Sequence, residues 1–400
     1  MLSTKPVVDW AVDSQARAEG VAARFRERFA SEPELWARAP GRVDLMGSHT
    51  DYNLGFVLTL PISRDTWIAA RRRNDGIVRV YSMNLDAEDE FRVDAIDSIS
   101  EPKWCNYVRS VAATLQDEGL ALTGYNAMIH STVPVEAGLS SSAALECALA
   151  TVFAGLGGWS LTPERKALLC QKAENEFVGV KCGILDQYSS CLGRAGCALL
   201  LDCRDLSTRA VWIADGIRVV ACNTMSQRRL SGGEYAQRRA ECEQGAAVLG
   251  VSALRDMTPE MLAARRHELP ERVARRCEFI VAESARAESL AQALIAGDRP
   301  AVARLCAKSF AGARDLYEIC SPAMVTMMDA MLAAPGVIGA RQAGAGFGGC
   351  MVALVDAACT DAFRAAVLAA YHSATQVLPE IYPVGAAPGA EVFDREKIGK

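Results

Sequence analysis

The amino-acid sequence predicts an α+β protein made of two domains, and three observations carry this prediction. The chain has 400 residues, which is more than one compact core usually holds. Strand-like and helix-like segments are mixed up to about residue 210, whereas residues 234–333 are almost wholly helical in character. Strand character then returns. Helices segregated from strands are typical of the α+β class, and the change in composition places the boundary between domains 1–205 and 206–400.

The individual elements follow from the spacing of apolar residues. Short apolar or alternating runs bounded by turn residues predict strands at 56–60, 66–69, 77–81, 197–201, 217–221, 337–340 and 351–355. Apolar residues three and four positions apart predict helices at 104–117, 142–155 and 360–371.

Composition and charge exclude several classes of protein. The chain is 50% hydrophobic and 23% charged, which is ordinary for a globular protein. Its net charge of −5 gives no general attraction for nucleic acid or for an anionic membrane. The first ten residues lack a signal-peptide core, and polar residues interrupt the weakly charged stretch 137–161, which favours a buried helix over a membrane span. We therefore expect a cytoplasmic monomer whose partners are small molecules.

The cysteines predict no metal centre and no disulfide framework. There are fourteen of them, none forms a C-x-x-C pair, and most have apolar neighbours, where cysteine behaves as a small hydrophobic residue. This usage is typical of a reducing compartment.

A first loop, 133–144, reads Val-Pro-Val-Glu-Ala-Gly-Leu-Ser-Ser-Ser-Ala-Ala and leads directly into an apolar helix. The amide groups at a helix N-terminus bind phosphate well, and the adjacent serines add donors or metal ligands. The alternative is a serine cap on a buried helix.

A second loop, 344–349, formally matches G-x-G-x-x-G, the fingerprint of nicotinamide and flavin oxidoreductases. That fingerprint needs a strand before it and a helix after it. Here a strand follows, so we reject the dinucleotide interpretation. A tight turn between two strands that approaches a ligand, or a simple hairpin, remains.

Two further segments are dense in polar residues. Residues 41–52 place Arg42, Ser48, His49 and Asp51 between apolar runs, which suits recognition of a polyhydroxyl ligand. Residues 173–188 carry Glu174 and Asp186 twelve positions apart, and such a pair could bind a metal and face a substrate hydroxyl. Alternatively, His49 has a structural role and Asp51 belongs to a turn. Glu174 and Asp186 would then be surface acids on two successive helices. No Walker A lysine motif and no protein-kinase H-R-D signature occurs.

In this order the segments resemble the galactokinases of the GHMP kinase superfamily. Residues 41–53 match G-R-V-N-L-I-G-E-H-T-D-Y-N with Asp44 for Asn and Ser48 for Glu, and 134–144 match P-x-G-A-G-L-S-S-S-A-A with Glu136 where Gly is usual. Residues 173–187 match A-E-N-x-F-V-G-V-x-C-G-I-x-D-Q, 344–350 match G-G-G-F-G-G-C, and 233–243 are a segment of the family's kind.

The resemblance implies the two-domain GHMP kinase fold, with ATP and Mg²⁺ in a cleft between the domains and transfer of the γ-phosphate to a sugar's anomeric hydroxyl. The implied catalytic residues are Arg42 and Asp186. The implied sugar-binding residues are Ser48, His49, Asp51, Gly183 and Tyr235. The residues implied to bind ATP are Trp104, near the adenine, and Gly138, Ser140, Ser141, Ser142, Ala143 and Gly346. Ser141 and Glu174 are the implied Mg²⁺ ligands.

The departure at Ser48 bears on the choice of sugar. In galactokinases the residue here is usually Glu, taken to bind the C6 hydroxyl, and a serine would lose that contact or make it through water. D-Galactose is the first expectation, with a galacto-sugar altered at C6, such as L-arabinose or D-galacturonate, as the alternative. A catalytically inactive sugar and ATP sensor is remote because the serine loop is intact, and the superfamily's decarboxylases lack the His49–Tyr52 segment.

Overall fold

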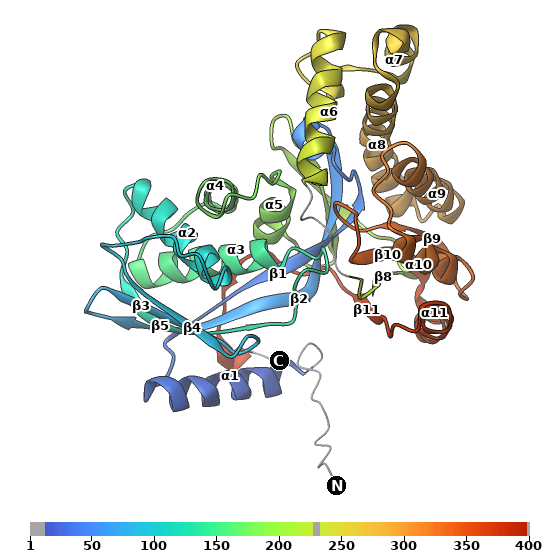
Figure 1. Ribbon diagram of the computed structural model, residues 1–400. Coiled ribbons are helices and arrows are strands. Elements are labelled where there is room, and N and C mark those ends of the chain that lie inside the picture. The colour runs from blue at the N-terminus through green and yellow to red at the C-terminus, as the bar shows by residue number, and fades with distance from the viewer. Residues whose placement is uncertain (1–12, 227–232, 398–400) are drawn as a thin grey trace.

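The computed structural model of the chain describes residues 13–226 and 233–397 as two β-sheets placed side by side, with helices packed around them (Figure 1). The predicted α+β class is confirmed. The longer helices are α1 (Ser14–Phe29), α2 (Trp104–Asp117), α3 (Ser141–Gly157), α4 (Pro163–Lys172), α5 (Leu185–Leu192), α6 (Glu234–Leu249), α7 (Pro259–Arg265), α8 (Glu271–Ala296), α9 (Arg299–Asp315), α10 (Pro322–Leu332) and α11 (Thr360–Thr375). The strands are β1 (Leu35–Met46), β2 (Phe56–Arg73), β3 (Ile77–Ser82), β4 (Ala87–Arg92), β5 (Gly124–Ser131), β6 (Cys197–Asp202), β7 (Thr208–Trp212), β8 (Ile217–Asn223), β9 (Val337–Gln342), β10 (Cys350–Asp356), β11 (Glu380–Val384) and β12 (Glu391–Val392).

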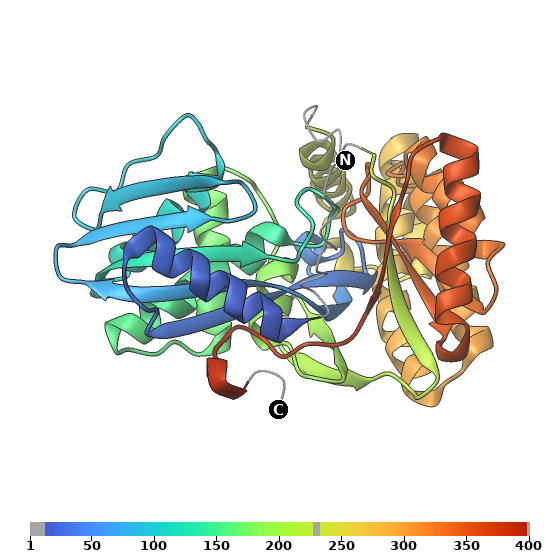
Figure 2. The same cartoon turned by 90° about the horizontal axis from the view of Figure 1, so that it is seen from below.

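The first sheet is eight-stranded, with the order β12-β1-β2-β5-β3-β4 and with β6 and β7 continuing from β2. Helix α1 covers one face, and α2 to α5 cover the other (Figures 1 and 2). The β3–β5 pair is parallel and the other pairs are antiparallel. Helix α3 lies against β1 and β2, and twelve of its seventeen residues are buried. The phosphate loop predicted at its N-terminus is therefore held by the core of this sheet.

The strands predicted at 56–60 and 66–69 are one strand, β2, which runs without a break from Phe56 to Arg73. The residues between them, Pro61 to Asp65, have the composition of a turn but mark a change of neighbour. On one edge β2 pairs with β6 up to Thr59 and with β5 from Thr66 onward. Pro61 lies between these two ladders, where its missing N–H interrupts neither of them.

The second sheet has the order β11-β8-β10-β9 and is antiparallel throughout. Helices α10 and α11 contribute to a methionine-rich core on this sheet, and α9 packs on β9. Helices α6, α7 and α8 form a separate upright group whose core includes Cys242, Leu254 and Phe279 (Figure 1).

The two sheets meet along the C-terminal end of β1. Val43, Leu45 and Met46 share a core with residues of β8, β10 and α8. The chain passes from the first sheet to the second between Trp212 and Ile217, and it returns when β12 pairs with β1. The residues that follow β1 are thereby placed at the junction. The exact domain boundary, expected near residue 205, stays a prediction.

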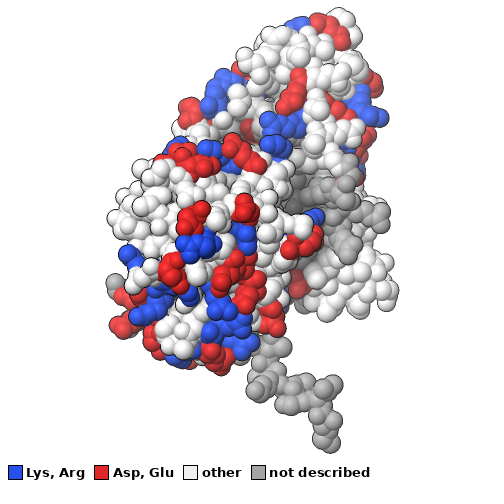
Figure 3. Space-filling model, turned by 60° about the vertical axis from the view of Figure 1, so that its left-hand side comes forward, with Lys and Arg blue, Asp and Glu red and all other residues white. Residues whose placement is uncertain are grey.

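Among residues 13–226 and 233–397, no helix is both long enough and apolar enough to cross a bilayer. On the face drawn in Figure 3, Lys and Arg are interspersed with Asp and Glu. Many exposed charges of the described chain are paired, as in Arg79 with Glu88 and Arg24 with Glu27.

Candidate active site

A cleft of about 1030 Å³ opens at the junction of the two sheets. Its walls come from all the segments that the sequence singles out, with Arg42, Glu174, Asp186, Tyr235 and Gly344 among the lining residues. Segments that are far apart in the chain thus share one cavity of the size expected for small-molecule substrates.

The serine loop, residues 133–144, lines the end of the cleft where the sequence predicts phosphate, which we call the phosphate end. Helix α3 begins at Ser141, and Ser140 before it adopts a left-handed conformation, with φ of 60°. The Ser140 side chain caps no helix amide, and its Oγ is buried without a hydrogen-bond partner among the described residues. The serine-cap alternative therefore does not describe this loop. The first amides of α3 and an unpaired hydroxyl remain available to a ligand.

Glu136 occupies the loop position where the family usually has glycine. Its φ is 58°, in the left-handed region that costs a residue with a side chain about 1–2 kcal/mol. The side chain is exposed and lines the cleft. The backbone at this position therefore has the shape that a glycine would favour, with an added negative charge.

Arg42 and Asp186 form an ion pair beside this loop. Arg42 Nε and Nη2 lie 2.8 and 2.5 Å from Asp186 Oδ1, and Nη1 donates to the Gly138 carbonyl at 2.7 Å. The Arg42 backbone amide also donates to the Leu139 carbonyl at 3.1 Å. Arg42 thus holds the phosphate loop and the first turn of α5 in one arrangement, and Asp186 stays partly open to the cleft.

Glu174 lies on a π-helical turn, Ala173–Val178, directly after α4. Its Oε2 accepts from Gln187 Nε2 at 2.7 Å, and it contacts the Cys182 thiol at 3.3 Å. Burial, and then the negative charge of Asp186, raise the pKa of Glu174 to about 7. A carboxyl group held in this way has a strong affinity for a nearby cation.

A second buried carboxyl group lies behind Glu174. Glu146 on α3 is fully buried, and its Oε1 has no partner in the described chain. Its Oε2 accepts from Gln187 Nε2 at 3.2 Å, so that one amide group bridges the two acids. Burial raises the pKa of Glu146 well above its ordinary range. This acid was not identified from the sequence, because it is one polar residue in an apolar helix pattern.

Also in the cleft wall, Asp51 and Gly183 fit closely against each other. A Cβ atom added to Gly183 would lie 1.7 Å from Asp51 Oδ2, so only glycine allows the carboxylate its position. Loss of solvent, opposed by backbone hydrogen bonds, raises the pKa of Asp51 to about 6. This carboxylate lies in the cleft near Asp186.

His49 is held by the protein on both sides of its ring. Its Nδ1 is 2.8 Å from the Tyr52 hydroxyl, and its Nε2 is 2.9 Å from the Ala345 carbonyl. The Tyr235 ring lies 5.3 Å away, centroid to centroid. His49 therefore joins the segment 47–53, which we call the sugar segment after its predicted role, to the glycine-rich loop. Tyr235 faces the cleft beside it.

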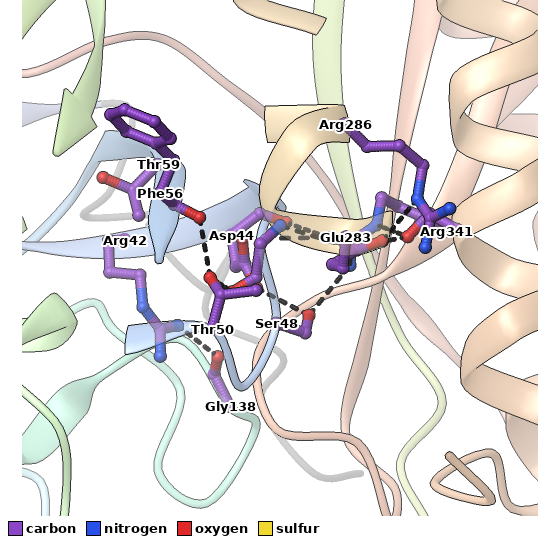
Figure 4. Close-up of polar contacts among 12 residues, drawn as sticks. Arg42, Asp44, Ser48, Thr50, Phe56, Thr59, Gly138, Glu283, Arg286 and Arg341 are labelled. Atoms are coloured by element: carbon purple, nitrogen blue, oxygen red, sulfur yellow. Dashed lines mark hydrogen bonds and ion pairs between the residues drawn. The ribbon is translucent and has the colours of Figure 1, made fainter. Parts of the chain in front are cut away.

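Ser48 lines the cleft, but its hydroxyl is engaged behind the wall (Figure 4). It donates to Asp44 Oδ2 at 2.7 Å and accepts from Arg341 Nη2 at 2.8 Å. Its one hydrogen is therefore already used. Arg341 was not identified from the sequence, although it stands only three positions before the glycine-rich loop.

The glycine-rich loop joins β9 to β10 as a turn between antiparallel strands, as the rejection of the dinucleotide fingerprint requires. Gly344 and Ala345 line the cleft. Gly346 packs on the Ile319 carbonyl, which a Cβ would approach to 2.6 Å. The Cys350 amide donates to the Ala137 carbonyl at 2.9 Å. The glycine-rich loop is therefore hydrogen-bonded to the serine loop at its C-terminal end.

Two other residues expected to bind ATP have different environments. Trp104 at the start of α2 lines the cleft, and its indole Nε1 is buried without a partner in the described chain. Ala143 is fully buried in α3 and takes part in its packing. Within residues 13–226 and 233–397 no three His, Cys, Asp or Glu side chains are grouped as metal ligands.

Comparison with known proteins agrees with this arrangement. Family models match residues 106–194 as the GHMP kinases N terminal domain and residues 290–373 as the GHMP kinases C terminal domain. A crystal structure of mevalonate kinase shares the fold, with a TM-score of 0.61 at 17% identity over 88% of this chain and 99% of that one. Fold and family models together define the chain as a GHMP kinase.

Within that superfamily the relationship is narrower. The galactokinase galactose-binding signature matches residues 23–72. The chain is 44% identical to the galactokinase of Roseiflexus sp. (strain RS-1) over 92% of its length and 95% of the relative's. It is 42% identical to the galactokinase of Streptomyces coelicolor over 94% and 98%. The crystal structure of Lactococcus lactis galactokinase complexed with galactose superimposes with a TM-score of 0.89 at 31% identity, covering 93% and 98%. This chain belongs to the galactokinase family.

Proposed function

We propose that the chain transfers the γ-phosphate of ATP to the anomeric hydroxyl of D-galactose. The observation that carries the proposal is the Arg42–Asp186 ion pair, which is fixed to the Gly138 carbonyl at the phosphate end of the cleft. Membership of the galactokinase family supports both the reaction and the sugar.

Phosphoryl transfer asks the protein mainly to align the two reactants and to stabilise spreading negative charge. Asp186 would orient the C1 hydroxyl and take up its proton as the new oxygen–phosphorus bond forms. Arg42 presents a planar, permanently charged fork between Asp186 and the loop. Because it is already hydrogen-bonded to both, it needs no rearrangement when charge develops on the phosphate.

The phosphate loop would receive the triphosphate. The first amides of α3, at Ser141 and Ser142, point their partial positive charge toward the cleft. The buried Ser140 Oγ gains a partner if a phosphate oxygen lies there. On the side of the cleft away from the serine loop, the ring of Trp104 would face the adenine of ATP. Its Nε1, which has no hydrogen-bond partner in the described chain, would be available to the adenine.

The residues present fit a magnesium ion. Mg²⁺ typically takes one or two protein oxygens and fills its other positions with phosphate oxygens and water. Glu174 and Ser141 offer such a pair of hard oxygen ligands at the phosphate end. When bound, Mg²⁺ supplies charge neutralisation between the β- and γ-phosphates. Burial makes Glu174 hold its proton more tightly, with a pKa of about 7, and a cation bound there would replace that proton and compensate the charge of the carboxylate.

The sugar would lie between Asp186 and the segment 47–53. Asp51 would accept from ring hydroxyls, and Gly183 and Tyr235 would form the walls beside it. Both ring nitrogens of His49 already face protein partners. We therefore assign His49 a positioning role for Tyr52 and the Ala345 carbonyl.

The alternative substrates fare differently at Ser48. D-Galacturonate would need a donor for its carboxylate, and Ser48 already donates its hydrogen to Asp44. L-Arabinose needs no hydrogen-bond partner at Ser48, because it carries only hydrogen at C5. The sensor alternative is not supported by the site, since the serine loop, Arg42, Glu174 and Asp186 stand together.

We also propose that the enzyme acts in the cytoplasm as a monomer. The cysteines of the described chain are not joined in disulfides, which suits a reducing compartment. Every proposed site residue comes from the same chain, so the proposed site can be assembled without a second copy.

The deciding experiment measures ADP release with ATP, Mg²⁺ and one free sugar at a time: D-galactose, L-arabinose, D-galacturonate or D-glucose. We expect D-galactose to have the highest kcat/KM and the product to carry phosphate on C1 by phosphorus NMR. ADP release that is independent of the sugar, or a phosphate on another carbon, would overturn the proposal.

A further inference from the structure

A buried ionic cluster lies directly behind the segment 47–53 (Figure 4). Arg341 on β9 is 1% exposed and Glu283 on α8 is 0% exposed. Arg341 Nη2 lies 2.9 Å from Glu283 Oε1, and Nη1 donates to the Asp44 carbonyl at 3.1 Å. Asp44 on β1, also buried, has its Oδ1 3.7 Å from Arg341 Nη1.

The cluster fixes the beginning of the sugar segment. Glu283 Oε1 accepts from the Gly47 amide at 3.2 Å, and the next residue, Ser48, bridges Asp44 and Arg341. Arg286 completes the cluster at 2.8 Å from Glu283 Oε2. Strand β1, strand β9 and helix α8 are thus tied to the same two loop residues.

The cluster has as many guanidinium groups as carboxyl groups. One of its acids stands at a different position than in the galactokinase signature. Two guanidinium groups, Arg286 and Arg341, face the two carboxyl groups of Asp44 and Glu283. The signature has a neutral Asn at position 44 and an acidic Glu at position 48. Here position 44 is acidic and position 48 is neutral. The two side chains are in contact at 2.7 Å. The acid of this contacting pair therefore stands at position 44 in this chain and at position 48 in the signature.

We propose that residues 44 and 48 form one coupled pair that, through Arg341, positions the sugar segment and sets recognition of the sugar's end remote from C1. The inference rests on the proposed function, which places the C1 hydroxyl of the sugar at Asp186. In this chain the acid is withdrawn behind the wall, and Ser48 presents neither a negative charge nor a free hydrogen to the sugar. Asp44 and Arg341 are positioning residues.

Coupling makes a specific prediction about the single variants. Ser48→Glu alone adds a third carboxyl group beside the buried Asp44, where like charges repel strongly. Asp44→Asn alone leaves Arg286 and Arg341 with one carboxylate between them. Each single change therefore unbalances the cluster, and the double change restores its charge.

The test is a double-mutant cycle on the full chain with Asp44→Asn, Ser48→Glu and the combination. We expect each single variant to raise the KM for galactose about tenfold or more, and the combination to return it to within about threefold, which is the mark of coupled sites. The KM for ATP should change less than about twofold in the combination. The ratio of kcat/KM for galactose over L-arabinose should rise about fivefold or more in the combination, because an acid again faces the sugar.

A matched control separates charge from size. Asp44→Asn with Ser48→Gln has nearly the same volume without the acid, so it should not recover the KM or the melting temperature. If the single variants do not fold, the melting temperatures of the two double variants decide. Additive effects, or equal behaviour of the two double variants, would overturn the inference. If the natural chain leaves galactose unphosphorylated, the proposed function fails, whereas the melting temperatures still test the coupling.

Discussion

The two ends of the cleft differ in how their polar atoms are satisfied. On the side of the cleft where we propose that ATP binds, which includes the phosphate end, Ser140 Oγ, Trp104 Nε1 and Gln187 Oε1 are buried without partners in the described chain. In the sugar segment the protein itself holds the side chains: Thr50 Oγ1 donates to the Phe56 carbonyl at 2.6 Å, and Asn53 donates to the His49 carbonyl at 2.8 Å.

A buried polar atom without a partner costs about 1–3 kcal/mol, so it is retained where a ligand supplies the partner. We therefore expect the phosphate end to be completed by what it binds, and the sugar segment, residues 47–53, to be shaped before anything binds. Changes at the first end should act on ligand and cation affinity. Changes at the second should act through the geometry of the loop.

The largest effect is expected where the two ends meet, at Asp186. Asp186→Asn keeps the size of the side chain but removes the proton acceptor and weakens the pairing with Arg42. We expect kcat to fall about 100-fold or more, with a KM for ATP within about threefold of the natural value. Steady-state kinetics with a thermal melt check this, and Asp205→Asn in an exposed turn is the control. Near-normal turnover in a folded Asp186→Asn protein would remove Asp186 from the mechanism.

The next largest effect should come from Glu174→Gln, which changes the phosphate end of the cleft alone. Glu174→Gln removes a charge at the proposed cation site and keeps the hydrogen bond from Gln187. We expect the Mg²⁺ concentration for half-maximal activity to rise about tenfold or more, while the KM for galactose changes little. A magnesium titration at saturating ATP measures this. Full activity of the natural chain in excess EDTA would contradict it.

Glu174 also gives a pH signature in the absence of ligands. Its pKa is raised to about 7 in the folded chain from an ordinary value of 4.5, so the folded state holds a proton that the unfolded state releases. Stability from this group is therefore present below pH 4.5 and is lost as pH rises through about 7. Relative to Glu174→Gln, the natural chain should lose about 2–3 kcal/mol between pH 5 and pH 8. Paired thermal melts across this range test it, and parallel curves would show that Glu174 titrates normally.

A smaller effect should come from the preformed end. Gly183→Ala places a methyl group 1.7 Å from Asp51 Oδ2, so either the carboxylate or the turn must move. We expect the KM for galactose to rise about fivefold to tenfold, with little change in the KM for ATP. Gly385→Ala is the matched control, because its added methyl group meets nothing within 4 Å. Equal kinetics of the two variants would mean that Asp51 does not depend on Gly183.

The sequence predicted the parts of this protein that local patterns determine. Helices expected at 104–117 and 142–155 are α2 at Trp104–Asp117 and α3 at Ser141–Gly157. The strand expected at 217–221 is β8. The turn between β9 and β10 followed from one observation, that a strand and not a helix comes after the glycines.

Contacts between distant segments could not be predicted in this way. The approach of Gly183 to Asp51, and the link from Glu283 to the Gly47 amide, join residues more than a hundred positions apart. Neither glycine nor a lone acid on a long amphipathic helix marks such a contact in one sequence. Ser48 was singled out by its departure from the family signature, but the side chains that hold it, Asp44 and Arg341, became evident only in the fold.

The smallest effect should separate backbone from charge at the phosphate loop, where Glu136 adopts a backbone conformation that favours glycine. Its φ of 58° suits glycine, so Glu136→Gly relieves about 1 kcal/mol in the folded chain but also frees the unfolded chain by a similar amount. The net change in stability should be small. The lost charge should lower the KM for ATP about twofold to fivefold, because a carboxylate beside the triphosphate repels it. Glu136→Gln keeps the side chain and removes only the charge, so it should show the same lower KM, and the gain should shrink in 0.5 M salt, where exposed charges are screened. If Glu136→Gln behaves like the natural chain while Glu136→Gly binds ATP more tightly, the left-handed backbone and not the charge limits the loop. The phosphate end would then be preformed like the sugar segment, and the contrast between the two ends would not hold.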